Sequence, residues 1–323
     1  MSAATSLLDV TNTVSISDPA PVAAAIAHIL GECFGHGSFD DDLLHATFER
    51  VGRVFAGDDP AYLACDMPYH DLRHSLDTAL TMARLIAGQQ GTGCAAPAAF
   101  TPEHALLGVL LALLHDTGYI RTVSEHALCG PQLTREHEAR SVEFAQRHLR
   151  TTLLAKRAAD AELIQVTQLA ADLDVLFARR EPAAVALGRM LGTADLVSQL
   201  ADERYLERCY WHLFPELVLG DCNRSRTVDG GEAPLFRDAL ELVCRTPAFY
   251  DNVVRPRLDR TFAGSVRHLS VPFGDTDIYG AAIERNIARA RSIAGGQHGL
   301  LGPEPTTTTA RLSPIYHAAP RRA

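Results

Sequence analysis

A run of ten small and apolar residues at 105–114 constrains the fold of this chain more than any other segment. It follows a Thr-Pro-Glu sequence at 101–103, a typical helix start because threonine caps the first turn and proline fits it. A helix that is apolar on every side has to be buried among other elements. The run ends at His115 and Asp116, and two polar side chains at the end of a buried helix need either a metal ion or hydrogen-bonding partners within the protein.

The rest of the chain also favours helix. Of its 323 residues, 47% are hydrophobic, and Ala and Leu dominate while the alternation typical of strands is scarce. We therefore predict an all-α fold with one domain over residues 19–294, between disordered segments at 1–18 and 295–323. Helices are expected near 19–33, 40–55, 71–87, 101–115, 134–150, 159–176, 183–200, 202–214, 234–245, 247–262 and 275–294, with loops at 90–101 and 223–233.

Charge and cysteine content narrow the classes of partner. The formal net charge is −9 and no basic block is present, so nucleic acid is not expected as a partner, although a small anionic substrate is compatible with this charge. We find no stretch of about 18 uncharged apolar residues and no signal peptide, and we expect no membrane partner. The seven cysteines form no C-x-x-C pair, which favours a reducing compartment and hence the cytoplasm. The oligomeric state does not follow from the sequence.

Three further polar side chains stand out against their neighbours. His70 and His74 are four residues apart and share one helix face if the helix already includes His70. Asp195 interrupts a helical face of small and apolar residues. Each of these features alone is also typical of an ordinary hydrogen-bonded side chain, so only their combination is informative.

Three motifs together carry a family resemblance. The run YHDLRHSLD at 69–77 resembles the motif Y-H-N-x-x-H-A-x-D of cyclic-nucleotide phosphodiesterases, although Asp and Ser replace its Asn and Ala. The run LLHDTG at 113–118 resembles the helix end that names the HD superfamily, without the phosphodiesterase continuation H-P-G. The segment 192–207 is similar to the distal aspartate helix of that superfamily. Over residues 65–215, the chain therefore resembles the HD-domain metal-dependent phosphohydrolases.

This resemblance implies a phosphodiesterase-like helical bundle with a divalent cation, Mg²⁺, Mn²⁺, Fe²⁺ or Zn²⁺, in its centre. Asp116 would be a ligand and would also bridge the cation to a water molecule or to a second ion, and His70 would protonate the leaving oxygen. The implied metal ligands are His74, His115, Asp116 and Asp195.

The resemblance suggests further site residues, of which His137 and the three arginines are also compatible with a solvated position. His137 is a candidate for a second metal or another site role. Asp77 would accept a hydrogen bond from His74 or His70. The candidate phosphate-binding residues are Arg73, Arg121 and Arg140.

The implied activity is that of a metal-dependent phosphohydrolase, either a phosphodiesterase or a phosphomonoesterase. Its metal-activated water would cleave a phosphate ester of a small molecule, such as a nucleotide or cyclic nucleotide. One alternative is an HD-type di-iron oxygenase, which needs a fuller His/Asp ligand set than we find. The other is a catalytically silent nucleotide-binding regulatory module, against which the intact ligand set argues.

Overall fold

The computed structural model describes residues 7–91, 100–226, 231–297, 299 and 301–305. The α-helices are α1 (Pro19–Phe34), α2 (Asp41–Ala56), α3 (Leu72–Gly91), α4 (Pro102–Leu114), α5 (His137–Leu149), α6 (Leu173–Phe177), α7 (Pro182–Ala201), α8 (Tyr205–Arg208), α9 (Phe214–Leu219), α10 (Ala239–Phe249) and α11 (Ile278–Ala294). The 3₁₀ and π segments are η1 (Thr117–Tyr119), η2 (Val123–Glu125), η3 (Gly130–Leu133), η4 (Ala155–Thr167), η5 (Cys209–Leu213), η6 (Tyr250–Val254), η7 (Arg257–Thr261), η8 (Ser265–Leu269) and η9 (Val271–Phe273).

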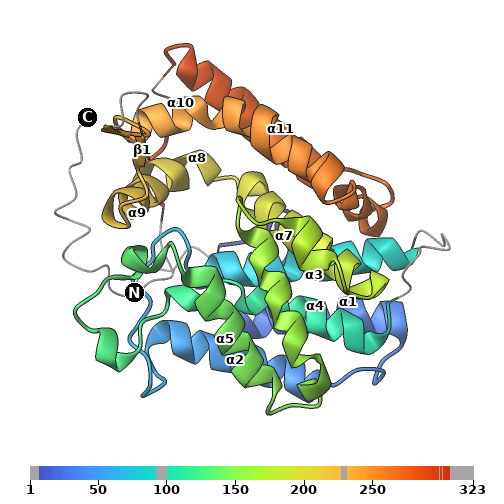
Figure 1. Ribbon diagram of the computed structural model, residues 1–323. Coiled ribbons are helices and arrows are strands. Elements are labelled where there is room, and N and C mark those ends of the chain that lie inside the picture. The colour runs from blue at the N-terminus through green and yellow to red at the C-terminus, as the bar shows by residue number, and fades with distance from the viewer. Residues whose placement is uncertain (1–6, 92–99, 227–230, 298, 300, 306–323) are drawn as a thin grey trace, which may run out of the picture.

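The described residues are mostly helical, as the composition predicts. Their two short strands, β1 (Arg224–Arg226) and β2 (Glu232–Pro234), form one antiparallel pair within the stretch expected to be a loop. In Figure 1, α1 to α5 lie on one side of α7, and α10 and α11 lie along the other side. None of the described helices is long and apolar enough to cross a lipid bilayer.

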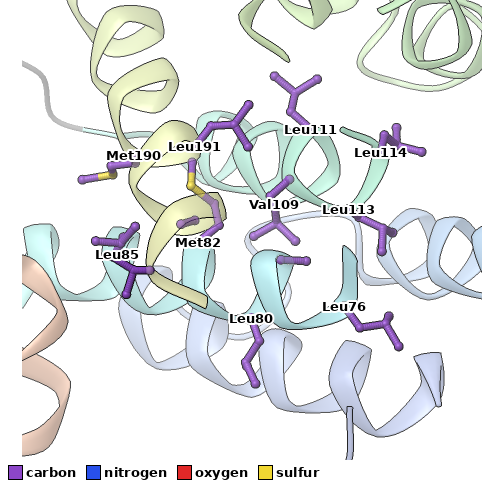
Figure 2. Close-up of a cluster of buried hydrophobic side chains, with 14 of the residues drawn as sticks. Leu76, Leu80, Met82, Leu85, Val109, Leu111, Leu113, Leu114, Met190 and Leu191 are labelled. Atoms are coloured by element: carbon purple, nitrogen blue, oxygen red, sulfur yellow. The ribbon is translucent and has the colours of Figure 1, made fainter. Parts of the chain in front are cut away.

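Helices α3, α4 and α7 pack against one another and form the core that carries the site. Every residue of α4 from His104 to Leu114 is buried, as expected for a helix that is apolar all round. Figure 2 shows leucine, methionine and valine side chains from the three helices meeting, among them Leu80, Val109 and Leu191. The side chains of α3 and α7 thus pack on α4 and fix the position of its C-terminal end.

The helix ends follow local capping chemistry. At the start of α4, the Thr101 hydroxyl accepts a hydrogen bond from the backbone N–H of His104, which closes a capping box. The side chain of Asp40 caps α2 by accepting from the N–H of Leu43. The expected helix ends near Cys33 and His115 are confirmed, since α1 ends at Phe34 and α4 at Leu114.

Three expected helices are wrong in detail, and the one expected over 202–214 is α8 followed by the π segment η5. The helix expected over 159–176 is the 3₁₀ segment η4, a break and the short α6. The guanidinium of Arg257 donates to the carbonyls of Val166, Gln168 and Leu169 at this break, and so satisfies backbone oxygens that a continuing helix would use. The helix expected over 247–262 contains the π segments η6 and η7, on either side of Pro256, which has no N–H to donate.

The N-terminal segment also differs from the expected disorder over the residues that the structure describes. The carboxylate of Asp9 accepts hydrogen bonds from the backbone N–H groups of Thr13 and Val14, and it pairs with Arg84 of α3 at 2.7 Å. Ile16 is only 1% exposed and belongs to the core. Residues 7–18 are therefore packed against the domain, whereas the expected disorder at 1–6 and 306–323 lies outside the described residues.

Candidate metal centre

Side chains from three helices converge at the end of α4. His74 comes from the first turn of α3, His115 follows α4 directly, and Asp195 comes from α7. The Nε2 atoms of His74 and His115 are 3.2 Å apart, and Asp195 Oδ1 lies 3.2 Å and 3.6 Å from them. All three residues are buried, and they form a group that could hold a metal ion.

Asp116 lies beside the two histidines of this group. Its Oδ2 lies 3.4 Å from His74 Nε2 and 3.2 Å from His115 Nε2. This oxygen is buried and accepts no hydrogen bond from the described residues, an expensive arrangement for a carboxylate. Atoms that bind one ion at about 2.0–2.2 Å lie roughly 3.0–3.4 Å apart. The observed separations and the unpartnered oxygen therefore both fit a bound cation.

Neighbouring groups orient the ligands. The ring of His115 donates a hydrogen bond from Nδ1 to the carbonyl of Ala112 at 2.7 Å, which leaves its Nε2 for the metal side. Asp195 Oδ1 accepts from the amide of Gln199 at 2.7 Å, and the amide oxygen of Gln199 accepts from the hydroxyl of Tyr69 at 2.8 Å. These bonds restrict the rotation of one histidine and one carboxylate of the centre.

The electrostatics favour ionised carboxylates. Burial by itself would raise the pKa of Asp116 and Asp195, but the neighbouring imidazoles outweigh it and hold the pKa of both carboxyls far below the ordinary value. Burial lowers the pKa of His74, whereas at His115 the two carboxylates outweigh burial and raise the pKa well above its usual range. A cation would thus find two negative ligands and would take the place of a proton on His115.

His70 lies beside this group, just before α3 begins at Leu72, and not on the helix face that we expected. Its ring centroid is 6.0 Å from that of His74. Its Nδ1 donates to Glu216 Oε2 at 2.6 Å, so its Nε2 is the atom left for a ligand or substrate. Burial would lower the pKa of His70, but the carboxylate of Glu216 outweighs burial and raises it.

His137 approaches the same centre from the start of α5. Its Nε2 lies 3.7 Å from Asp116 Oδ1, and its Nδ1 donates to the carbonyl of Thr134 at 2.7 Å. The ring of Tyr119 stacks on His137 with centroids 4.2 Å apart and on His70 with centroids 4.9 Å apart. Tyr119 therefore separates and orients the two histidines that border the metal-binding group.

The three arginines considered for phosphate binding have partners within the protein. Arg140 forms a bidentate pair with Glu125 and donates to backbone carbonyls. Arg121 pairs with Asp66 at 3.1 Å, and Arg73 pairs with Asp202 at 2.9 Å. None of these contacts among the described residues involves the candidate metal-binding group.

Asp77 likewise makes no hydrogen bond to His74 or His70 among the described contacts. The hydroxyl of Thr78 lies 3.5 Å from His74 Nδ1. The Oδ1 atom of Asp77 is buried and has no hydrogen-bond partner among the described residues. Asp77 lines a cavity of about 20 Å³ together with Arg73 and His74.

Our sequence analysis missed Glu216 and Tyr119. The available signal for Glu216 was a lone acidic residue in an apolar run at 213–219, and for Tyr119 an aromatic residue three positions after Asp116. No model of a known protein family matches this chain, and a search of curated proteins finds no match either.

Proposed function

We propose that this protein is a metal-dependent phosphohydrolase of the HD type that acts on the phosphate ester of a small molecule such as a nucleotide. The observation that carries the proposal is the convergence of His74, His115 and Asp195, from three separate segments, on one set of closely spaced ligand atoms, with the Asp116 carboxylate beside the two histidines. The HD-type identity rests on the motif resemblance over residues 65–215.

The donor set of two imidazoles and two carboxylates suits Mg²⁺, Mn²⁺, Fe²⁺ or Zn²⁺. When bound, such a cation supplies Lewis acidity toward a phosphoryl oxygen and makes water a better nucleophile. The protein itself supplies the ligand orientation described above. The Oδ1 atom of Asp116 lies 3.7 Å from Nε2 of His137. Asp116 can therefore accept the proton of an attacking water next to a second polar side chain.

His70 is the candidate proton donor to the leaving oxygen. Its imidazolium form is stabilised by Glu216, and the proton it would release is on Nε2, because Nδ1 is engaged with the carboxylate. The side chain of His70 is 21% exposed, whereas those of the four metal-binding residues are 2–11% exposed. A substrate therefore reaches the group from the side of His70.

The proposal is tested by metal analysis of the purified protein, followed by a panel of phosphate esters with Mg²⁺, Mn²⁺, Co²⁺ and Fe²⁺. The panel contains cyclic nucleotides, nucleoside monophosphates and deoxynucleoside triphosphates, and Asp195→Asn serves as the matched variant. We expect turnover that depends on the metal and is lost in Asp195→Asn. A metal-loaded protein that binds nucleotides but releases no phosphate product would indicate a regulatory module, and iron content with oxygen uptake would indicate an oxygenase.

A further inference from the structure

Residues 301–305, which we call the C-terminal strap, lie against α8 and η5. The backbone N–H of Gly302 donates to Glu207 Oε1 at 2.8 Å, and the carbonyl of Gly302 accepts from the indole Nε1 of Trp211 at 3.3 Å. The guanidinium of Arg204 donates to the next carbonyl of the strap at 2.8 Å. All three hydrogen bonds use backbone atoms of the strap, so the conformation of this segment, and not only its side chains, is held by the helix.

His212, the residue after Trp211, is buried next to the strap. Its side chain is 1% exposed, and its Nε2 lies 3.8 Å from Oε1 of Glu304 in the strap. Both ring nitrogens are buried and have no hydrogen-bond partner among the described residues. Burial of a neutral imidazole without partners is costly, and burial of a charged one costs considerably more. The docked strap therefore favours the neutral form of His212.

The charges around His212 do not offset this effect of burial. Besides Glu304, four charged side chains act on the ring: Arg208, Asp71, Arg73 and Asp202. They form two ion pairs, Arg208 with Asp71 at 3.2 Å and Arg73 with Asp202 at 2.9 Å, so their effects largely cancel. The side chain of Glu304 is 38% exposed, and water screens its charge. Burial, followed by the charge of Arg208, therefore lowers the pKa of His212 to about 3.

Release of the strap would give the ring of His212 access to water, and its pKa would return toward the ordinary value of about 6.5. The released form then binds a proton at higher pH than the docked form. Docking is therefore strongest above about pH 6.5 and weakens as the pH falls toward about 3. Between pH 7 and pH 4, this difference in pKa lowers the equilibrium constant for docking by at most about 200-fold.

We propose that residues 301–305 form an acid-sensitive strap, which is docked on α8 and η5 while His212 is neutral and is released when His212 takes up a proton. The helix that it covers continues through η5 into α9. On this helix, Arg208 donates to the carbonyl of Tyr69, and Glu216 accepts from the backbone N–H groups of Tyr69 and His70. The strap thus lies on the helix that holds the segment leading into α3. The proposal goes beyond phosphohydrolase activity and does not require it.

The test uses Trp211, the single tryptophan of the chain. Its indole N–H donates to the strap, so the one indole signal in a nitrogen–proton correlation spectrum reports docking. A chain truncated after residue 300 lacks the strap, and the matched control, truncated after residue 305, keeps it. At pH 7 we expect the full chain and the control to share one signal, distinct from that of the shorter chain. Between pH 7 and pH 4, the signal of the full chain and of the control should move toward that of the chain without the strap.

Three variants identify the group that titrates. His212→Leu should keep the strap docked down to pH 4, because the side chain can no longer take up a proton. Arg204→Ala removes one hydrogen bond to the strap and should move the release to higher pH, since a weaker contact needs less protonation to open. Glu304→Gln should retain the release, because Glu304 is not the group that takes up the proton.

Four results would overturn the proposal. They are identical indole signals in the two truncated chains at pH 7, no change of the signal in the full chain down to pH 4, a release that persists in His212→Leu, and a release that disappears in Glu304→Gln. The last result would assign the titration to Glu304. If His212→Leu loses its helical circular dichroism, Arg204→Ala decides in its place. An unmoved midpoint in Arg204→Ala would show that the signal reports the local titration of His212 and not the release of the strap.

Discussion

The carboxylate of Glu216 accepts three hydrogen bonds, two from His70 and one from Tyr69. Its Oε2 accepts a hydrogen bond from the ring Nδ1 of His70 at 2.6 Å, and its Oε1 accepts from the backbone N–H groups of Tyr69 and His70 at 2.6 Å and 3.3 Å. One buried side chain thus fixes both the ring and the backbone of the segment that leads into α3. The imidazole is held in place before any substrate arrives, as proton transfer to a leaving group requires.

Substitution of His70 should separate acid catalysis from metal binding. We expect His70→Gln to lower kcat by about 10²–10⁴-fold with unchanged metal content, because in the proposed mechanism His70 would donate a proton without ligating the cation. The loss should shrink for nitrophenyl phosphate esters, whose leaving group needs no proton. The exposed His36→Gln is the control. If His70→Gln loses metal, or loses the same rate on both kinds of ester, the acid role is wrong.

Removal of the Glu216 charge should move the pH profile. The carboxylate raises the pKa of His70, and a general acid loses activity as the pH rises through its pKa. In Glu216→Gln the pKa of His70 falls. The decrease of kcat at alkaline pH should therefore begin at lower pH than in the parent protein, while the acidic side of the curve of kcat against pH changes less. The measurement is kcat against pH for both proteins. An unmoved decrease at alkaline pH would show that Glu216 acts only in packing.

Loss of one carboxylate should weaken metal binding strongly. We expect Asp195→Asn to lower the affinity for Mn²⁺ by about 10²-fold or more, since one of two negative ligands disappears. In the parent protein, metal at a hundred times its Kd should stabilise the fold by about 2.7 kcal/mol. Thermal unfolding with and without Mn²⁺ measures both effects, with the remote Asp259→Asn as control. An equal metal-dependent rise of Tm in Asp195→Asn would exclude Asp195 as a ligand.

The turn after Asp116 requires a glycine because α5 approaches it closely. A Cβ atom on Gly118 would lie 1.9 Å from the carbonyl oxygen of His137, so α5 would have to move. We expect Gly118→Ala to destabilise the fold by about 1–3 kcal/mol and to displace His137 from Asp116. The control is Gly295→Ala, where the nearest atom is 3.4 Å away. Denaturant unfolding of both variants gives the comparison, and an unchanged midpoint in Gly118→Ala would contradict it.

His148, a buried histidine outside the candidate metal centre, should make the stability of the fold depend on pH in the acidic range. Arg50 donates to Nδ1 of His148 and so requires the neutral ring, whose Nε2 donates to Thr47. Burial and Arg50 lower the pKa of His148 to about 4. The unfolded chain therefore binds a proton at higher pH than the folded chain, and stability falls as the pH drops from about 6.5 to about 4.

The single proton on His148 contributes at most about 1.4 kcal/mol per pH unit to this slope. The free energy of unfolding, measured across the window in the parent and in His148→Gln, gives the contribution as a difference. We expect a flatter dependence in the variant. Parallel curves would show that His148 does not titrate differently in the two states.

The sequence predicts the helical character and the residues His74, His115 and Asp195 that the fold brings together, because their motifs are encoded locally. The apolar run that ends at His115 and the spacing around His74 are visible without a structure. Partners that come from distant segments are not visible in this way. Glu216 meets His70 across 146 residues, and nothing near either residue indicates the pairing. The irregular segments η4, η6 and η7 depend in the same way on tertiary contacts such as those of Arg257.

The hydrogen bond from the His115 ring to the Ala112 carbonyl joins a ligand to the end of its own helix. That carbonyl would otherwise lack a partner, so His115 cannot rotate away without exposing a buried backbone oxygen. The amides of α4, buried throughout, should therefore exchange with deuterium only when the whole molecule opens. On heating, the partly exposed side with His70 and His137 loosens first, and the His115 side of the centre persists until the fold itself is lost.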